Sequence, residues 1–285
     1  MKIITIIISV FFAIVFASCE DVIQVKLDEG EPILTIDAFI NNMRTQQKVR
    51  LTYTSGYFSQ KANNGVTGAT VQLKDLTTGK EYLFKDLANG NYVYDIIGTD
   101  TLGRVGHSYE LTVTNQSNVF KARSHLNRTT KVDTIISEFK EASFGSTAGY
   151  ETFFVAKDSV GNTPDFYWIK TFINRKFLNK GNEIKVSYDA AFGPGYDGEE
   201  FIIPIASIGT FKQFDTCRVE LHSINLDTYN FLLQVQQQVT NGGLFATNPE
   251  NIRTNITNTS NTKTKVVGWF CMSAVEFNEK VIKGK

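Results

Sequence analysis

Proline and cysteine are scarce in this chain of 285 residues, and neither sign of charge is in excess. Only 5 prolines accompany 22 phenylalanines and 11 tyrosines, which excludes a disordered stalk and indicates a folded body with ample aromatic core material. Lysine and arginine number 29, as do aspartate and glutamate. This balance argues against nucleic acid as a partner, because a nucleic-acid-binding protein favours a clearly basic surface.

The first 18 residues are ordered as in a secretory signal peptide: a lysine at position 2, an apolar run over 3–16, and an Ala-Ser pair. The run is shorter than the roughly 20 residues that a membrane-spanning helix needs. The sequence "FASC" (16–19) resembles a bacterial lipobox, with Phe16 where leucine is usual. We therefore expect a lipid on Cys19, a lipidated linker over 19–29, and a protein that is anchored to a membrane without spanning it.

Runs of β-branched and aromatic residues follow, several of them alternating between apolar and polar side chains. Turn sequences such as "TTGK" and "ANGN" separate them. Short polar connections favour antiparallel pairing, since parallel strands need longer crossovers. The stretch 68–96 resembles the immunoglobulin-like and transthyretin-like sandwiches of bacterial surfaces, so we assign 30–120 to one such domain. The strands expected in it are 33–40, 48–54, 69–76, 80–87, 91–97 and 108–114.

The polar, weakly periodic stretch 121–132 predicts a connector, and 133–285 predicts a second β-rich domain with one helix. "SINLDTYNFLLQVQQQVTNGG" indicates a helix near 225–240, because Ser and Asn stand where an N-cap belongs and an Asn-Gly-Gly sequence follows. "KVVGWFCMSAVEF" predicts one closing strand. The predicted fold class is mainly β, with two β-sandwich-like domains. The other strands expected are "TIISEFKEA", "ETFFVAKDS", "FYWIKTFIN", "EIKVSYDAAF", "EFIIPIASI" and "CRVELHSI".

Catalytic signatures are missing from the sequence. His107, His125 and His222 have no partner at metal-ligand or catalytic spacing, and the motif Gly-x-Ser-x-Gly is absent. We expect no catalytic residue, no metal and no cofactor, and hence no enzyme. Cys217 and Cys271 leave two readings open, a disulfide in an oxidising compartment or two small buried hydrophobic residues.

Two loop-like stretches carry acidic residues that could hold a cation. "KDSVGNTPDF" places Asp158, Asn162 and Asp165 in one loop, but without the ligand spacing of a calcium loop, so an Asx-rich turn is favoured. In "GPGYDGEE" a solvated hairpin tip is favoured over a metal cage. Its acidic residues are Asp197, Glu199 and Glu200.

Aromatic residues in loops are better candidates for recognition. Tyr57 and Phe58 precede a loop-like stretch, and Phe192 and Tyr196 lie in a glycine-rich one. Exposed aromatic side chains bring a large contact area with little rotamer entropy to lose. The alternative is that these four side chains pack under their loops and close the ends of the sandwiches.

Segments from both halves of the chain carry a family resemblance, among them "GEPILTIDAFI", "GRVGHSYELTV", "VELHSINLDTYNFLLQVQQQ" and "GGLFATNPENIRTNI". The chain resembles the Bacteroidota lipoproteins catalogued as domain of unknown function 4249. The resemblance implies an outer-membrane lipoprotein, often encoded beside TonB-dependent transporters, with no known enzymatic activity. In that group acidic residues after the lipidated cysteine resemble an export signal to the cell surface, and Glu20 and Asp21 stand there.

Three functions from different classes follow. The first, which we favour, is a non-catalytic accessory component of a TonB-dependent transport complex, anchored in the outer membrane and facing the cell surface, with an unknown ligand. The second is a free-standing surface module that binds glycan, peptide or host protein. The third is a hydrolase built from two carboxylates that are distant in sequence.

Overall fold

The computed structural model describes residues 30–56, 59, 64–143, 147–158, 160–161, 164–189, 198–242, 246–247 and 251–284, without the side chains of 207–209. Residues 32–285 form one compact unit. No helix in the described ranges is long and apolar enough to cross a membrane. Seven of the predicted site residues lie outside the described residues, so their roles stay predictions: Cys19, Glu20, Asp21, Tyr57, Phe58, Phe192 and Tyr196.

The six strands expected before residue 120 are all present, with bounds close to the prediction, and a seventh follows them. They are β1 (Leu34–Asn41), β2 (Gln47–Tyr53), β3 (Thr70–Asp75), β4 (Glu81–Asp86), β5 (Asn91–Tyr94), β6 (Ser108–Asn115) and β7 (Asn118–His125).

Strand β7 corrects the sequence prediction, which placed much of this stretch in a connector. Its inward residues are Phe120, Ala122 and Ser124, two of them small, so the apolar alternation is weak. Outward, Lys121 and Arg123 pair with Glu110 of β6 at 2.9 and 2.8 Å. The strand is therefore held by partners on β6 rather than by strong hydrophobic patterning of its own.

The rest of the chain is also mainly β, which confirms the predicted class. Its elements are β8 (Val132–Lys140), β9 (Gly149–Lys157), β10 (Phe166–Ile173), β11 (Lys176–Phe177), the 3₁₀ helix η1 (Gly181–Glu183), β12 (Lys185–Tyr188), β13 (Glu200–Phe211), β14 (Thr216–Ile224), the helix α2 (Leu226–Thr240), β15 (Thr257–Asn258), β16 (Val266–Ser273) and β17 (Val275–Val281).

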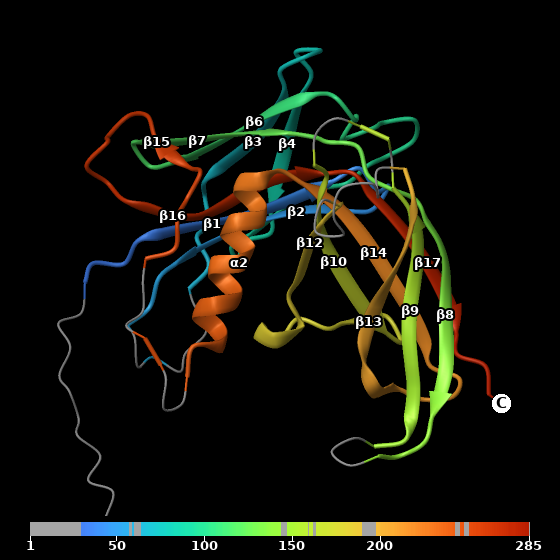
Figure 1. Cartoon of the computed structure of the whole chain (residues 1–285). Coiled ribbons are helices and arrows are strands. Elements are labelled where there is room, and N and C mark those ends of the chain that lie inside the picture. The colour runs from blue at the N-terminus through green and yellow to red at the C-terminus, as the bar shows by residue number, and fades with distance from the viewer. Residues whose placement is uncertain are drawn as a thin grey trace, which may run out of the picture. The chain divides into compact units, whose positions relative to one another are not determined.

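A nine-stranded sheet runs in the order β15-β7-β6-β3-β4-β5-β2-β1-β16. In Figure 1, β6 and β7 lie above β1 and β16, while α2 lies below them. Residues of β1, β2, β3, β6, β7 and β16 share one buried core between these two layers. The sheet folds over far enough that Met272 N on β16 donates to Ser124 Oγ on β7, at 2.9 Å.

Alternation along β1 gives this layer two different faces. Leu34, Ile36, Ala38 and Ile40 point into the sandwich core and are buried. The residues between them point the other way, toward α2 and β10: Thr35, Asp37, Phe39 and Asn41.

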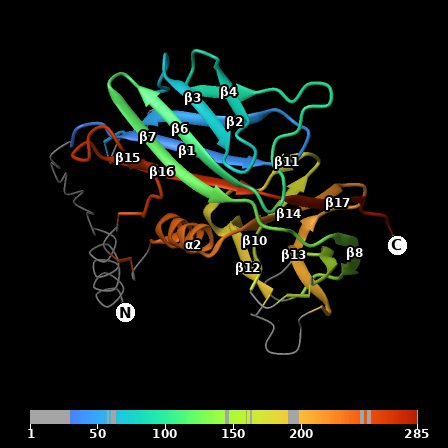
Figure 2. The same ribbon diagram turned by 90° about the horizontal axis from the view of Figure 1, so that it is seen from above.

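Two further sheets enclose a second core. One has the order β11-β10-β14-β17, with β12 also paired to β10, and the other has the order β13-β9-β8. Figure 2 shows these strands beside the nine-stranded sheet. Alternate residues of β10 and β14, such as Tyr167, Ile169, Val219 and Leu221, are buried in this second core.

The predicted single closing strand is wrong: the chain breaks at Ala274 into β16 and β17. β16 pairs in parallel with β1, whereas β17 pairs antiparallel with β14. The break is fixed by Ser223 at the end of β14, because Ala274 N donates to Ser223 Oγ at 3.0 Å and Ser223 N donates to Ala274 O at 2.9 Å. Strands from the two sides of the predicted connector at 121–132 therefore pair with each other, as β1 does with β16.

The predicted helix is confirmed as α2. Asn225 is its N-cap, and its side chain accepts a hydrogen bond from Thr228 N at 2.8 Å. The helix ends at Thr240, and Asn241 follows with φ −71°, an extended conformation rather than a left-handed cap. Gln236 Nε2 donates to Ile184 O at 2.8 Å, which ties the helix to the segment after η1.

Cys217 and Cys271 are free thiols, so the buried-hydrophobe reading is confirmed. Cys217 of β14 lies in the core between the two smaller sheets. Cys271 of β16 lies in a separate buried cluster with residues of α2. Burial raises the pKa of Cys217 to about 12 and that of Cys271 to about 11, so both thiols stay protonated and unreactive at neutral pH.

Because Gly268 has no side chain, β16 can lie close to the backbone of β1 at this position. We predict that Gly268→Ala lowers the free energy of unfolding by about 3 kcal/mol or more. Its φ is +108°, and an added Cβ would stand 2.0 Å from Ile36 O on the paired strand. Urea unfolding measures the effect. Gly79→Ala is the matched control, because Gly79 has φ +78° with nothing within 4 Å and carries only the backbone cost of about 1–2 kcal/mol. Equal losses in the two variants would contradict the predicted clash.

Candidate functional site

A groove of about 740 Å³ lies between the outward face of β1 and β2, the β10–β11 hairpin and α2. The outward residues of β1 form its floor. Phe231, Leu232 and Val235 of α2 form one wall, and Trp168 of β10 belongs to the other. Its volume is in the range of small-molecule binding sites.

Five aromatic rings run across this groove in a continuous row, which we call the aromatic row. Its members in order are Phe177, Trp168, Phe39, Phe231 and Trp269. Neighbouring ring centroids are 6.5, 5.1, 6.5 and 4.4 Å apart. All except Trp269 are half-buried, so four of the rings keep surface that a ligand can reach.

Three cations and one carboxylate line the groove: Lys48, Arg50, Lys170 and Asp37. Lys170 Nζ lies 3.9 Å from the centre of the Trp168 ring, a cation–π contact. Burial lowers the pKa of Lys170 to about 8, although Glu220, Cys271 and Asp37 act to raise it. Desolvation by the groove raises the pKa of Asp37, against the lowering effect of the three cations.

A buried ionic network lies beside Lys170 on β14. Glu220 accepts from Arg218 Nε through Oε1 and is bonded to His222 Nε2 through Oε2, both at 2.9 Å. His222 Nδ1 lies 3.3 Å from Ser273 Oγ on β16. Burial, and next the positive charge of Lys170, lower the pKa of His222 to about 4, so this imidazole is neutral at pH 7.

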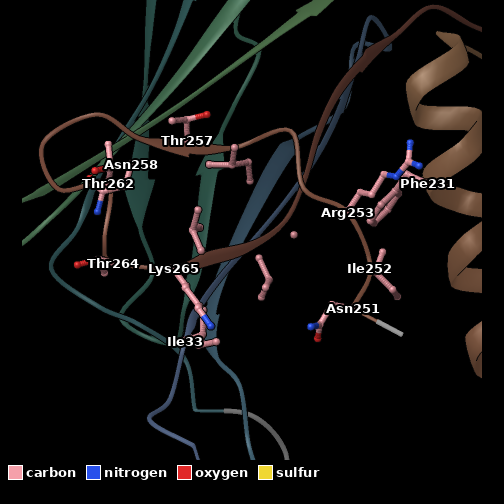
Figure 3. A pocket seen from close by; sticks show the side chains of 14 residues that line it. Ile33, Phe231, Asn251, Ile252, Arg253, Thr257, Asn258, Thr262, Thr264 and Lys265 are labelled. Atoms are coloured by element: carbon pink, nitrogen blue, oxygen red, sulfur yellow. The ribbon is translucent and has the colours of Figure 1, made fainter. Parts of the chain in front are cut away.

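A second hollow of about 710 Å³ lies beyond Phe231 and Gly268, which line both cavities. Figure 3 shows residues 251–253 running past α2 on one side of it and Thr257 and Asn258 on the other. Four of its lining residues, Asn251, Ile252, Arg253 and Ile256, come from the end of "GGLFATNPENIRTNI". Its cations, Arg253 and Lys265, are exposed to solvent, whereas Lys170 is half-buried.

The structure places the acidic loop that contains Asp158 and Asp165 beside Asp189 and Arg128, which the sequence did not indicate. Asp158, Asp165 and Asp189 each place a carboxylate oxygen within 4.8 Å of the others, while Asn162 lies outside the described residues. Arg128 binds Asp165 at 3.0 Å. Burial raises the pKa of Asp165, against the lowering effect of that guanidinium. The arrangement is an acidic cluster with a fixed cation of its own, and a calcium ion there stays a hypothesis.

His107 and His125 each lie beside one polar side chain. His107 Nδ1 lies 2.8 Å from Asp75 Oδ2, and His125 Nδ1 lies 3.0 Å from Ser108 Oγ. Glu199 and Glu200 are exposed and do not belong to the aspartate cluster, while Asp197 lies outside the described residues.

A family model described as "Domain of unknown function (DUF4249)" matches residues 20–278. This chain belongs to the DUF4249 family. Curated proteins show no match to it.

The groove of this DUF4249 protein was missed by sequence reasoning, which looked for recognition in loops. The groove residues lie on the outward face of strands whose inward face was correctly assigned to the core. The available signal was the pair of large aromatic residues Phe39 and Trp168 at outward positions of β1 and β10, because large apolar side chains gathered on an exposed face often mark a binding site.

We predict that the DUF4249 protein loses about 2–3 kcal/mol of its free energy of unfolding between pH 6.5 and pH 4 through His222 alone. The pKa of His222 falls from 6.5 to about 4 on folding, so over this window the unfolded chain takes up a proton that the folded chain does not. Urea unfolding across this pH range measures the loss, and His222→Gln should flatten it. His125→Gln, at an exposed position, is the control. An unchanged pH profile in His222→Gln would refute the assignment.

Proposed function

We propose that this DUF4249 protein is a lipid-anchored, non-catalytic binding component of a TonB-dependent transport complex in the outer membrane. In this role the groove between β1, β10 and α2 captures a ligand for the partner barrel. The groove is the observation that carries the proposal.

The groove has the composition of a recognition site rather than of leftover surface. Most of its aromatic rings are only half-buried, and its charged groups line a concavity with apolar walls. Ligand sites combine such walls with a few well-placed polar groups. Rigid strands supply the floor and one wall, which favours binding without large rearrangement.

The sequence supports the membrane location. A diacylglycerol on Cys19 would hold the protein firmly, since each buried methylene contributes about 0.8 kcal/mol. Glu20 and Asp21 support export to the outer face of the outer membrane. Together with family membership over residues 20–278, these features favour an accessory lipoprotein.

A free-standing surface module is the second candidate. The groove supports ligand binding in this role too, because the described residues that line it all belong to the unit 32–285. The two candidates differ in whether a barrel accompanies the protein in the membrane.

We predict that the tagged protein, solubilised from its native outer membrane in mild detergent, brings down a TonB-dependent barrel in stoichiometric amount. Mass spectrometry identifies the co-purifying proteins. Recovery of the lipoprotein alone, together with its digestion by protease added to intact cells, would overturn the accessory role and favour the free-standing module.

We predict that Cys19→Ser abolishes incorporation of labelled fatty acid and removes the protein from the outer-membrane fraction. Cys271→Ser is the matched control, because that thiol is buried and carries no lipid in this proposal. Retention of the Cys19→Ser variant in the outer membrane would contradict the anchor, whatever the pulldown shows.

A further inference from the structure

We propose that the groove takes an organic anion, a ligand with a carboxylate or phosphate group joined to a flat apolar portion. This inference rests on the proposed function, in that it names the ligand class of the same groove. Its basis is the set of cations that the groove presents without direct ionic partners.

Glu220 is the acidic neighbour of Lys170. Lys170 and Glu220 are register partners on β10 and β14, so their side chains share one face of the sheet. Both carboxylate oxygens of Glu220 are already bonded, one to Arg218 and the other to His222. Among the described residues no carboxylate lies within 4.0 Å of Lys170 Nζ, whose contacts are the rings of Trp168 and Phe177.

Two further cations, Lys48 and Arg50, line the groove from β2. Lys48 and Arg50 are exposed, outward residues of β2, and neither forms an ion pair within 4.0 Å in the described part of the chain. Among the described residues that line the groove, Asp37 is the one carboxylate. Three cations against one anion leave a net positive charge facing the cavity, which attracts an anion and repels a cation.

Aromatic rings in the groove offer a surface for the apolar portion of the ligand. The aromatic row extends across the groove from the cation at Lys170 toward Trp269. An anion bound at Lys170 would therefore have ring surfaces beside it, and a flat apolar body can pack there. A small inorganic anion would use only the charged part of the site.

The chain contains its own reporters for the test. It has two tryptophans, Trp168 and Trp269, and both line the groove. Tryptophan emission from the full chain, held in a neutral detergent at constant ionic strength, can be titrated with four probes: phenylacetate, phenyl phosphate, benzyl alcohol and benzylamine. The first two carry the two acid groups, and the last two supply the same ring without negative charge.

We expect saturable emission changes with phenylacetate, phenyl phosphate or both, and at least tenfold weaker binding of benzyl alcohol and benzylamine. Which acid binds more tightly identifies the head group. Lys170→Met should weaken anion binding about tenfold, as expected for loss of one charge-assisted contact. Arg50→Gln should also weaken anion binding. Arg50 is exposed, so this second test does not depend on whether the half-buried Lys170 site tolerates methionine. Lys85→Met removes the same charge on β4, outside the groove, and should leave binding unchanged.

Two outcomes would overturn the inference, and they are distinguishable. Equal or tighter binding of benzyl alcohol or benzylamine would sink the anionic ligand class while leaving the groove as a binding site. No emission change with any of the four probes would count against the groove itself and thus against the proposed mode of ligand capture. The pulldown of a barrel is independent of both results.

Discussion

The parallel pairing of β1 with β16 is the constraint on which the rest of the structure depends. It aligns eight residues of each strand, from Leu34 with Val266 to Asn41 with Ser273. On one face this pair closes the sandwich core, and on the other it sets Phe39 and Trp269 beside α2. Because β16 runs on through Ala274 into β17, the same pairing also holds the second group of sheets against the first.

Local sequence predicted the elements well wherever one face of a strand is strongly apolar. The first six strands and α2, with its Asn225 cap, were recognisable because alternation and capping act within a few residues. β7 was not fully predicted because two of its inward residues, Ala122 and Ser124, are small and give little apolar alternation. Its outward cations are paired with Glu110 on another strand, which the local sequence does not reveal. The division of the last strand at Ala274 depends on Ser223, a partner that no local pattern reveals.

The candidate site was much harder to predict, for a physical reason. Alternation tells which residues of β1 and β10 face away from their cores, but not that these two outward faces meet. Phe39 and Trp168 belong to two different sheets, and the packing of these sheets against each other brings their rings to 5.1 Å. The acidic loop shows the same limit: Asp158 and Asp165 could be read from one segment, whereas Asp189 and Arg128 are added by tertiary structure. Loop aromatics remain candidates on sequence grounds.

The late position of β16 in the chain has a consequence for biogenesis. A nascent chain exposes the edge of β1 until residues 266–273 are available, because the partner strand of β1 lies more than 200 residues further along the chain. Unpaired strand edges promote misassembly, and sheets of such high contact order fold slowly. Factors that cover the edge of β1 in the incomplete chain would therefore matter more for this protein than for a sandwich closed by neighbouring hairpins. Premature termination before residue 266 would leave that edge permanently unpaired.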